Sequence, residues 1–287
     1  RGGLKMARFR VIVNISLNNF RLWTRNKRIL IIAILAFIWI HYLVNPILKF
    51  SQSVNVNITP FVFPHLFLNW YSILIMLLLS VLLFCDAPFM SSRTPYECIR
   101  SGKQFWIKGQ IIYIFEAATL FVLFMIITSI ACLYPNICFR NDWGKVLNTL
   151  AQTNVGMQFN IMPVSYFMMI NYTPIEAMFL SSIMLVLIIN MIGLIMLVLN
   201  MAISRVVGIF VALFLAFLPA FASVSDSPKL YYVIPTTWAN ITMFDVKGTS
   251  LCPTLLYAVI GILVINLALR FTAVHLIKNR QVEIISH

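Results

Sequence analysis

The chain has 287 residues, of which 61% are hydrophobic and 10% are charged. Soluble domains average about 25% charged residues, so this composition excludes a soluble globular domain. The 21 Lys and Arg residues outnumber the 8 Asp and Glu residues, but they cluster beside apolar runs, which indicates membrane orientation rather than nucleic-acid binding. The composition therefore predicts an all-α polytopic membrane protein.

The start of the chain predicts a basic amphipathic helix. Over residues 4–28, apolar side chains recur every three to five positions, while Arg and Lys occupy both ends. Such a helix lies in the membrane interface rather than across the bilayer. No small-residue cleavage site follows, so the start resembles a signal anchor, with Met6 as a candidate true start. We expect residues 1–28 to form a cytoplasmic elbow helix and residues 29–287 a membrane domain.

Six apolar runs have the length that a helix needs to cross about 30 Å of hydrocarbon. They cover residues 29–48, 66–85, 111–134, 177–200, 206–222 and 255–277. Six spans would place both termini on one side, and 16 of the 21 basic residues would then share that side, against five opposite. By the positive-inside rule this split predicts cytoplasmic termini. We expect the protein to reside in a bacterial cell membrane.

Two segments predict structure on the outer side of the membrane. Residues 135–174 are rich in aromatic side chains and favour short helices packed on the outer leaflet. After the fifth run, Pro219, Pro228 and Pro235 predict a broken hairpin that dips back into the leaflet.

No motif of a nucleotide-binding, metal-binding or hydrolytic site occurs in the sequence. It contains no P-loop and no H-E-x-x-H, and its five cysteines lack the spacing of zinc ligands. A disulfide on the outer side, such as one between Cys138 and Cys252, is an open alternative to unpaired thiols. The chain is therefore not expected to be an enzyme by itself, nor to hold catalytic, cofactor or metal residues.

Two ionisable residues, Glu116 and Arg270, lie within the apolar runs. At about 1.5 Å per residue, each lies about 10–12 Å from the cytoplasmic end of its helix. Charge inside a membrane is costly and marks function or pairing, and the equal depth permits an ion pair. The alternative, which the sequence favours slightly, is that each side chain snorkels to the headgroup region.

The loop between the second and third runs carries the strongest functional signal. Residues 86–110 have the sequence DAPFMSSRTPYECIRSGKQFWIKGQ, which predicts a helix over 94–106 with bends at Gly102 and Gly109. A basic loop bound to anionic lipid would explain the charge alone. An aromatic-faced helix instead favours docking to a cytoplasmic protein. The residues expected to make that contact are Arg93, Tyr96, Glu97, Arg100, Lys103 and Trp106.

Taken together, these features resemble the membrane subunit of an ABC transporter of the ABC-2 (type V exporter) family. The resemblance rests on the basic elbow, the six runs, the loop above, the tight NMAISR turn and the Pro-broken SPKLYYVIPTTWANI hairpin. It implies that the 94–106 helix docks into a separate ATPase subunit, which holds ATP and Mg. It also implies a second permease subunit, identical or different, on the far side of one transport path.

The sequence therefore predicts a permease subunit of an ATP-driven exporter. A runner-up is a non-transporting assembly factor or sensor that anchors a cytoplasmic partner through the same loop. An ion-coupled carrier is a third hypothesis, and its transport would have to survive ATP depletion.

Overall fold

The computed structural model describes residues 2–23, 26–90, 94–225, 227–246, 248 and 250–279. Within them the regular elements are helices, with two isolated β-bridges and no strand. In chain order they are α1 (Gly2–Arg21), α2 (Lys27–Ser53), η2 (Phe63–Phe67), α3 (Trp70–Phe84), α4 (Thr94–Ser101), α5 (Lys103–Ala131), α6 (Gly144–Gln152), α7 (Val155–Gln158), α8 (Tyr166–Asn171), α9 (Pro174–Ala202), α10 (Arg205–Val224), α11 (Leu230–Val233), η3 (Pro235–Ala239), η4 (Ile241–Met243) and α12 (Leu255–Asn279). The predicted all-α class is confirmed.

Five helices among the described residues are long and apolar enough to cross a bilayer, namely α2, α5, α9, α10 and α12. They define an integral membrane protein. The helix α3 has 15 residues and is about 22 Å long, which is less than the hydrocarbon thickness of about 30 Å. The predicted run 66–85 begins instead in the 3-10 helix η2, and the chain turns at Asn69 before α3 starts. A sixth crossing stays a prediction.

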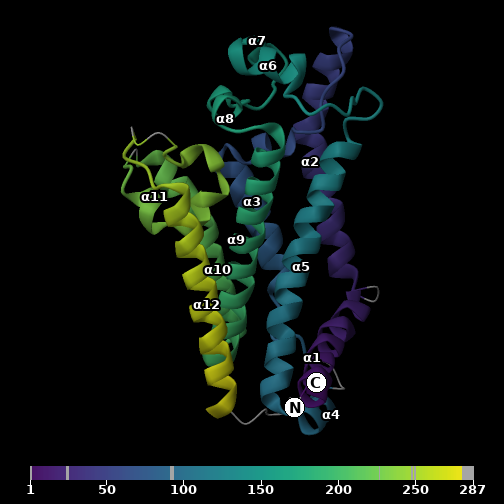
Figure 1. Ribbon diagram of the computed structural model, residues 1–287, viewed down its shortest axis with the longest axis vertical. Coiled ribbons are helices and arrows are strands. Elements are labelled where there is room, and N and C mark those ends of the chain that lie inside the picture. Colours follow the sequence, from purple (N-terminus) through teal and green to yellow (C-terminus); the bar gives the residue numbers. More distant parts are fainter. Residues whose placement is uncertain are drawn as a thin grey trace.

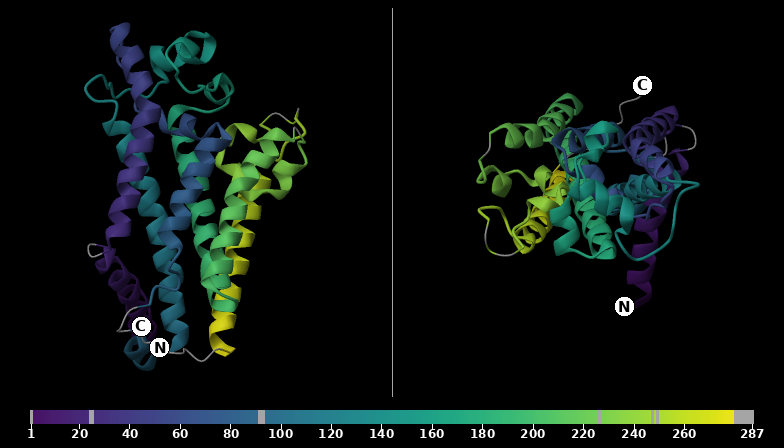
Figure 2. Two further views of the ribbon diagram at one scale, coloured as in Figure 1. Left: turned by 180° about the vertical axis from the view of Figure 1, so that it is seen from behind. Right: turned by 90° about the horizontal axis from the view of Figure 1, so that it is seen from above.

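The long helices run along one axis, and short helices gather at both ends (Figure 1). The end that carries α6, α7 and α8 is called here the cap end. The opposite end carries α1, α4 and the last turn of α12, and is called the terminal end. Figure 2 shows α1 sloping outward from the bundle at the terminal end.

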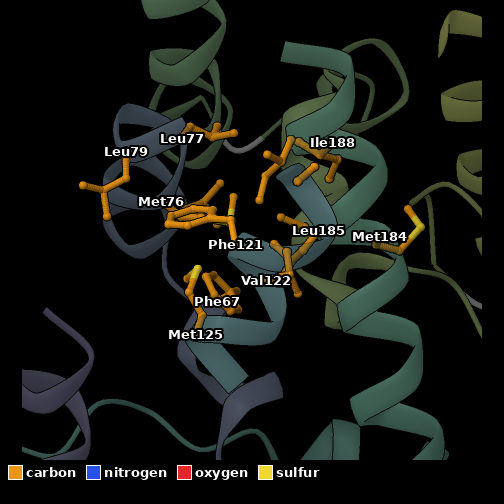
Figure 3. Close-up of a cluster of buried hydrophobic side chains, with 14 of the residues drawn as sticks. Phe67, Met76, Leu77, Leu79, Phe121, Val122, Met125, Met184, Leu185 and Ile188 are labelled. Carbon is orange, nitrogen blue, oxygen red and sulfur yellow. The ribbon is translucent and has the colours of Figure 1, made fainter. Parts of the chain in front are cut away.

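The centre of the bundle is a close-packed apolar core between α3, α5 and α9. Figure 3 shows side chains of these helices pointing toward one another, among them Met76, Phe121 and Leu185. Met76 and Leu185 are fully buried, and Phe121 is 6% exposed. Since α9 contacts α3, α5, α10 and α12, it is the central helix around which the others are arranged.

The predicted helix break at Pro219 is wrong, because α10 continues through this proline to Val224. Proline has no N–H, so the carbonyl oxygen of Leu215, four residues earlier, loses its helical donor. The hydroxyl of Thr236 in η3 donates to that oxygen at 3.2 Å, and Thr236 is fully buried. The segment after α10 thus supplies the hydrogen bond that the proline removes, as irregular backbone can when protein buries it.

The cap end has the short helices that its sequence predicts. The segment leading to α6 is tied to the chain before α3, since Ile58 donates to the carbonyl of Asn136 and accepts from the N–H of Cys138, both at 2.8 Å. The later segment forms α11, η3 and η4 rather than one helix, as Pro228 and Pro235 predict. Cys138 and Cys252 form no disulfide, so the unpaired alternative holds for this pair.

Candidate coupling surface at the terminal end

The loop expected to hold one helix over 94–106 holds two helix segments. The first, α4, ends at Ser101, and Gly102 has a φ of 86°, a conformation that favours glycine. The second, α5, begins at Lys103. The predicted bend at Gly102 is therefore confirmed, but the helix predicted over 94–106 is divided there, because Gly102 ends α4 and redirects the chain into the bundle.

One face of α4 is exposed at the terminal end. Tyr96 is 75% exposed, Ile99 is 84% exposed and Arg100 is also exposed. Their spacing of three and four residues places them on one side of the helix, which we call the docking face. Thr94 and Cys98 are buried instead, so α4 rests on the bundle by its opposite side. Large apolar side chains beside an arginine are typical of protein contact surfaces.

The other predicted contact residues differ in their exposure. Lys103 is exposed at the start of α5. Trp106 is 1% exposed, so the expectation that it fills a pocket of a partner is wrong: after Gly102 the chain turns inward and buries the indole. Arg93 and the side chain of Glu97 lie outside the described part of the chain.

Side-chain hydrogen bonds hold α1 against α5. Two come from α1 itself, from Ser16 to Glu116 and from Asn19 to Gln110 (3.2 Å). A third runs from the indole of Trp23, two residues after the end of α1, to the Tyr113 hydroxyl (2.7 Å). The helices also approach closely, since a Cβ added at Gly109 would lie 2.6 Å from a methyl carbon of Ile15. The predicted bend at Gly109 does not occur, because this glycine serves helix contact inside α5.

The segment of residues 86–90, which follows α3, is fixed to three helices. The Arg28 guanidinium of α2 pairs with the Asp86 carboxylate at 2.5 Å. The amide of Asn200 in α9 donates to the carbonyl of Ala87 at 2.5 Å. The amide of Gln110 in α5 donates to the carbonyl of residue 89 at 3.3 Å. We call residues 86–90 the anchored segment.

The two intramembrane charges lie on neighbouring helices but do not pair with each other. The Glu116 carboxylate accepts from the hydroxyl of Ser16 on α1. The guanidinium carbon of Arg270 lies 6.0 Å from the ring centroid of Phe115, a cation–π distance. The ion pairs among the described residues are those of Arg28 and of Arg140, so the sequence-permitted Glu116–Arg270 ion pair is not formed.

A buried amide pair links α9 to α12 within the bundle. The Asn190 amide donates to the side-chain oxygen of Asn266 at 2.6 Å, and both residues are at most 2% exposed. Interhelical amide bonds of this kind stabilise packing in membranes. In the part of the chain that the structure describes, no group of three or more His, Cys, Asp or Glu side chains is placed to hold a metal.

Reasoning from the sequence missed the contacts of α1 and of the anchored segment. One signal was present: Gln110 and Glu116 are polar residues six positions apart at the start of an otherwise apolar run. Polar groups at such depth need partners. The sequence does not say which helix supplies them, and the structure assigns them to α1.

Comparison of this chain with protein-family models, with curated proteins and with solved structures finds no match.

Proposed function

We propose that this chain is the membrane-spanning permease subunit of an ATP-driven ABC exporter. The observation that carries the proposal is the docking face of α4, which presents Tyr96, Ile99 and Arg100 outward at the terminal end. This surface lies outside the bundle, beside the basic helix α1 (Figure 1). It has the size and chemistry to enter a cleft of a cytoplasmic ATPase, which would bind ATP and Mg.

The position of α4 supports a coupling role. Gly102 alone separates α4 from the membrane-length helix α5, so a displacement of α4 by closing ATPase subunits acts directly on a spanning helix. The opposite side of α4 is buried against the bundle. A displacement of α4 would therefore be transmitted to the membrane domain through packed side chains. Rigid elements that shift between two packed positions are the usual carriers of such motion.

A second permease subunit would complete the transport path, and α10 supplies a face suited to it. Four phenylalanines on this helix are between 53% and 68% exposed: Phe210, Phe214, Phe217 and Phe221. Their spacing of three and four residues makes one aromatic stripe along the helix. Aromatic side chains are enriched where subunits pack, so we assign this stripe to the contact with the second permease.

The proposal is tested with the double variant Tyr96→Ala, Arg100→Glu, expressed in its native host and purified with its partners. The wild-type chain is expected to co-purify with an ATPase and to show substrate-stimulated ATP hydrolysis. The double variant should lose the ATPase while inserting in the membrane at the wild-type level, because the substituted side chains point away from the bundle.

The matched control is Tyr134→Ala, Arg140→Glu, which makes the same two changes in exposed residues at the cap end. It should retain the ATPase. Equal loss in both variants would point to a general defect and count against the docking face. Retention of a partner without ATPase activity, lost in the first variant only, would favour the sensor or assembly factor instead.

A further inference from the structure

Two adjoining cavities lie along α2 toward the cap end. The larger, of about 970 Å³, is bounded by the second half of α2 and by residues 157–163. The smaller, of about 490 Å³, lies between α2 and α3. Ile38 and Tyr42 line both, so the two cavities form one continuous groove, which we call the α2 groove.

The α2 groove lies at the depth of one membrane leaflet. Arg28 and Lys49 are 21 residues apart on α2, which is about 32 Å at 1.5 Å per residue. This distance is close to the hydrocarbon thickness of about 30 Å, which allows the two cations to lie at the two headgroup levels. Lys49 lines the larger cavity. The smaller cavity follows α2 from Tyr42 to Leu35, and these two residues are about 10 Å apart along the helix, toward the bilayer centre.

The larger cavity has the chemistry of a phosphate site. Among the described residues that line it, Lys49 is the only charged one, and none is Asp or Glu. Asn45, Asn160 and His41 add amide and ring N–H donors to the same lining. An anion placed there would meet one positive charge and several donors, without a competing carboxylate.

A backbone acceptor lies in the same place. Pro46 is inside α2 and has no N–H, so the carbonyl of Tyr42, four residues earlier, lacks its helical donor. Both residues line the larger cavity. A hydroxyl on the headgroup can donate to that carbonyl, which the ionised phosphodiester of a phospholipid, having no O–H, cannot.

The smaller cavity has the chemistry of an acyl-chain site. Its lining is entirely aliphatic or aromatic, contributed by Leu35, Ile38, Trp39 and Tyr42 of α2 and by Ile75, Leu78, Leu79 and Leu82 of α3. A ligand that fills both cavities must therefore carry an anion at the headgroup level and a hydrocarbon chain directed toward the bilayer centre.

We propose that the α2 groove binds one anionic glycerophospholipid of the leaflet at the cap end. Its phosphate is held by Lys49, its headgroup hydroxyl by the Tyr42 carbonyl, and one acyl chain by the groove between α2 and α3. This inference is independent of the proposed transport function, because it uses no residue of the docking face.

The test is native mass spectrometry of the full chain in detergent, titrated with phosphatidylglycerol or with phosphatidylethanolamine of the same acyl chains. The wild type should bind one phosphatidylglycerol at least fivefold more tightly than phosphatidylethanolamine. Lys49→Gln should remove that preference and leave the weaker binding unchanged. Lys145→Gln, an exposed lysine of α6 outside the groove, should keep the preference.

A second variant and a competitor complete the test. Ile38→Trp should weaken both lipids, because this residue is 56% exposed and lies where the two cavities meet. Glycerol 3-phosphate, the headgroup without chains, should not displace the lipid. Equal losses in Lys49→Gln and Lys145→Gln, no loss in Lys49→Gln, or displacement by glycerol 3-phosphate would each overturn the proposal, because they indicate general surface charge, an unused groove or a free-anion site.

Discussion

The hydrogen bond from Thr236 in η3 to the carbonyl of Leu215 in α10 predicts an energetic coupling between these two elements. Thr236→Val keeps the shape of the side chain but removes the hydroxyl that serves the carbonyl freed by Pro219. A buried acceptor left without a donor costs about 1–3 kcal/mol. We therefore expect the free energy of unfolding to fall by that amount in the single variant.

Pro219→Ala should change the outcome, because alanine restores an N–H that can donate to the Leu215 carbonyl within α10. In this background Thr236→Val should cost about 0.5 kcal/mol or less, which gives a coupling energy of about 1–2 kcal/mol. The assay is reversible unfolding by SDS in mixed micelles, followed by circular dichroism, for the wild type, both single variants and the double variant.

Thr237→Val is the matched control for this cycle. Thr237 is also buried, at 3% exposed, but its hydroxyl bonds to the carbonyl of Ile234 within the same turn at 2.7 Å. Its loss should be equal with and without Pro219→Ala. The reasoning is refuted if Thr236→Val costs the same in both backgrounds, or if Thr237→Val shows an equal coupling.

Three further predictions concern single sites in the bundle. Gly208→Ala should destabilise the fold by about 1–3 kcal/mol in the same unfolding assay, because the added Cβ would lie 1.9 Å from the side-chain oxygen of Asn200. Asn200→Ala has its own cost, since it removes the bond to the Ala87 carbonyl, but in that background Gly208→Ala should cost much less than in the wild type. Burial lowers the pKa of His65 from 6.5 to about 3, so between these two pH values the unfolded state binds the proton and the folded state does not. The free energy of unfolding should therefore fall by about 2 kcal/mol from pH 8 to pH 5. A His65→Gln variant should show a flatter dependence of stability on pH. Glu116→Gln and Arg270→Gln should have additive effects to within about 0.5 kcal/mol, since their side chains contact different partners; a larger coupling would show that the two charges interact.

Features that depend on local sequence were predictable. The apolar runs set the long helices, and Pro228 and Pro235 set the irregular segment before α12. The turn between α9 and α10 follows from Ser204, whose hydroxyl caps α10 by accepting from the N–H of Val207. Each of these signals acts within one or two helical turns, so the residues that determine the local conformation are neighbours in the sequence.

Features that depend on long-range partners were not predictable. Pro219 is a helix breaker by local rules, and it is tolerated because Thr236 lies 17 positions later and folds back onto α10. The sequence suggested that Trp106 contacts a partner, but the direction in which the chain turns at Gly102 buries its side chain. That direction cannot be read from the local sequence. A residue's partner, not its type, decided the outcome in both cases.

The contacts at the terminal end indicate which helices would move together when α4 is displaced. Two hydrogen bonds of α1, a third from Trp23 just after it and the close approach at Gly109 join this part of the chain to α5, so under the proposed function a force on α4 that passes through Gly102 would carry both helices. On the other side, α9 is joined to α12 by the Asn190–Asn266 bond.

The α5–α9 contact in the core is apolar, whereas α5 meets α12 through Phe115 and Arg270, and the anchored segment is bonded to both α5 and α9. Gly193 of α9 lies against Ile114 of α5, where an added Cβ would approach a methyl carbon to 2.5 Å. The labelled core side chains of α5, Phe121, Val122 and Met125, are apolar (Figure 3). Apolar helix faces slide past each other without breaking hydrogen bonds, which is the shear motion that packed helices permit. Under the proposed coupling function, α1 would therefore move with α5 rather than act as a fixed anchor, and the α5–α9 contact is where the two units would shift past each other.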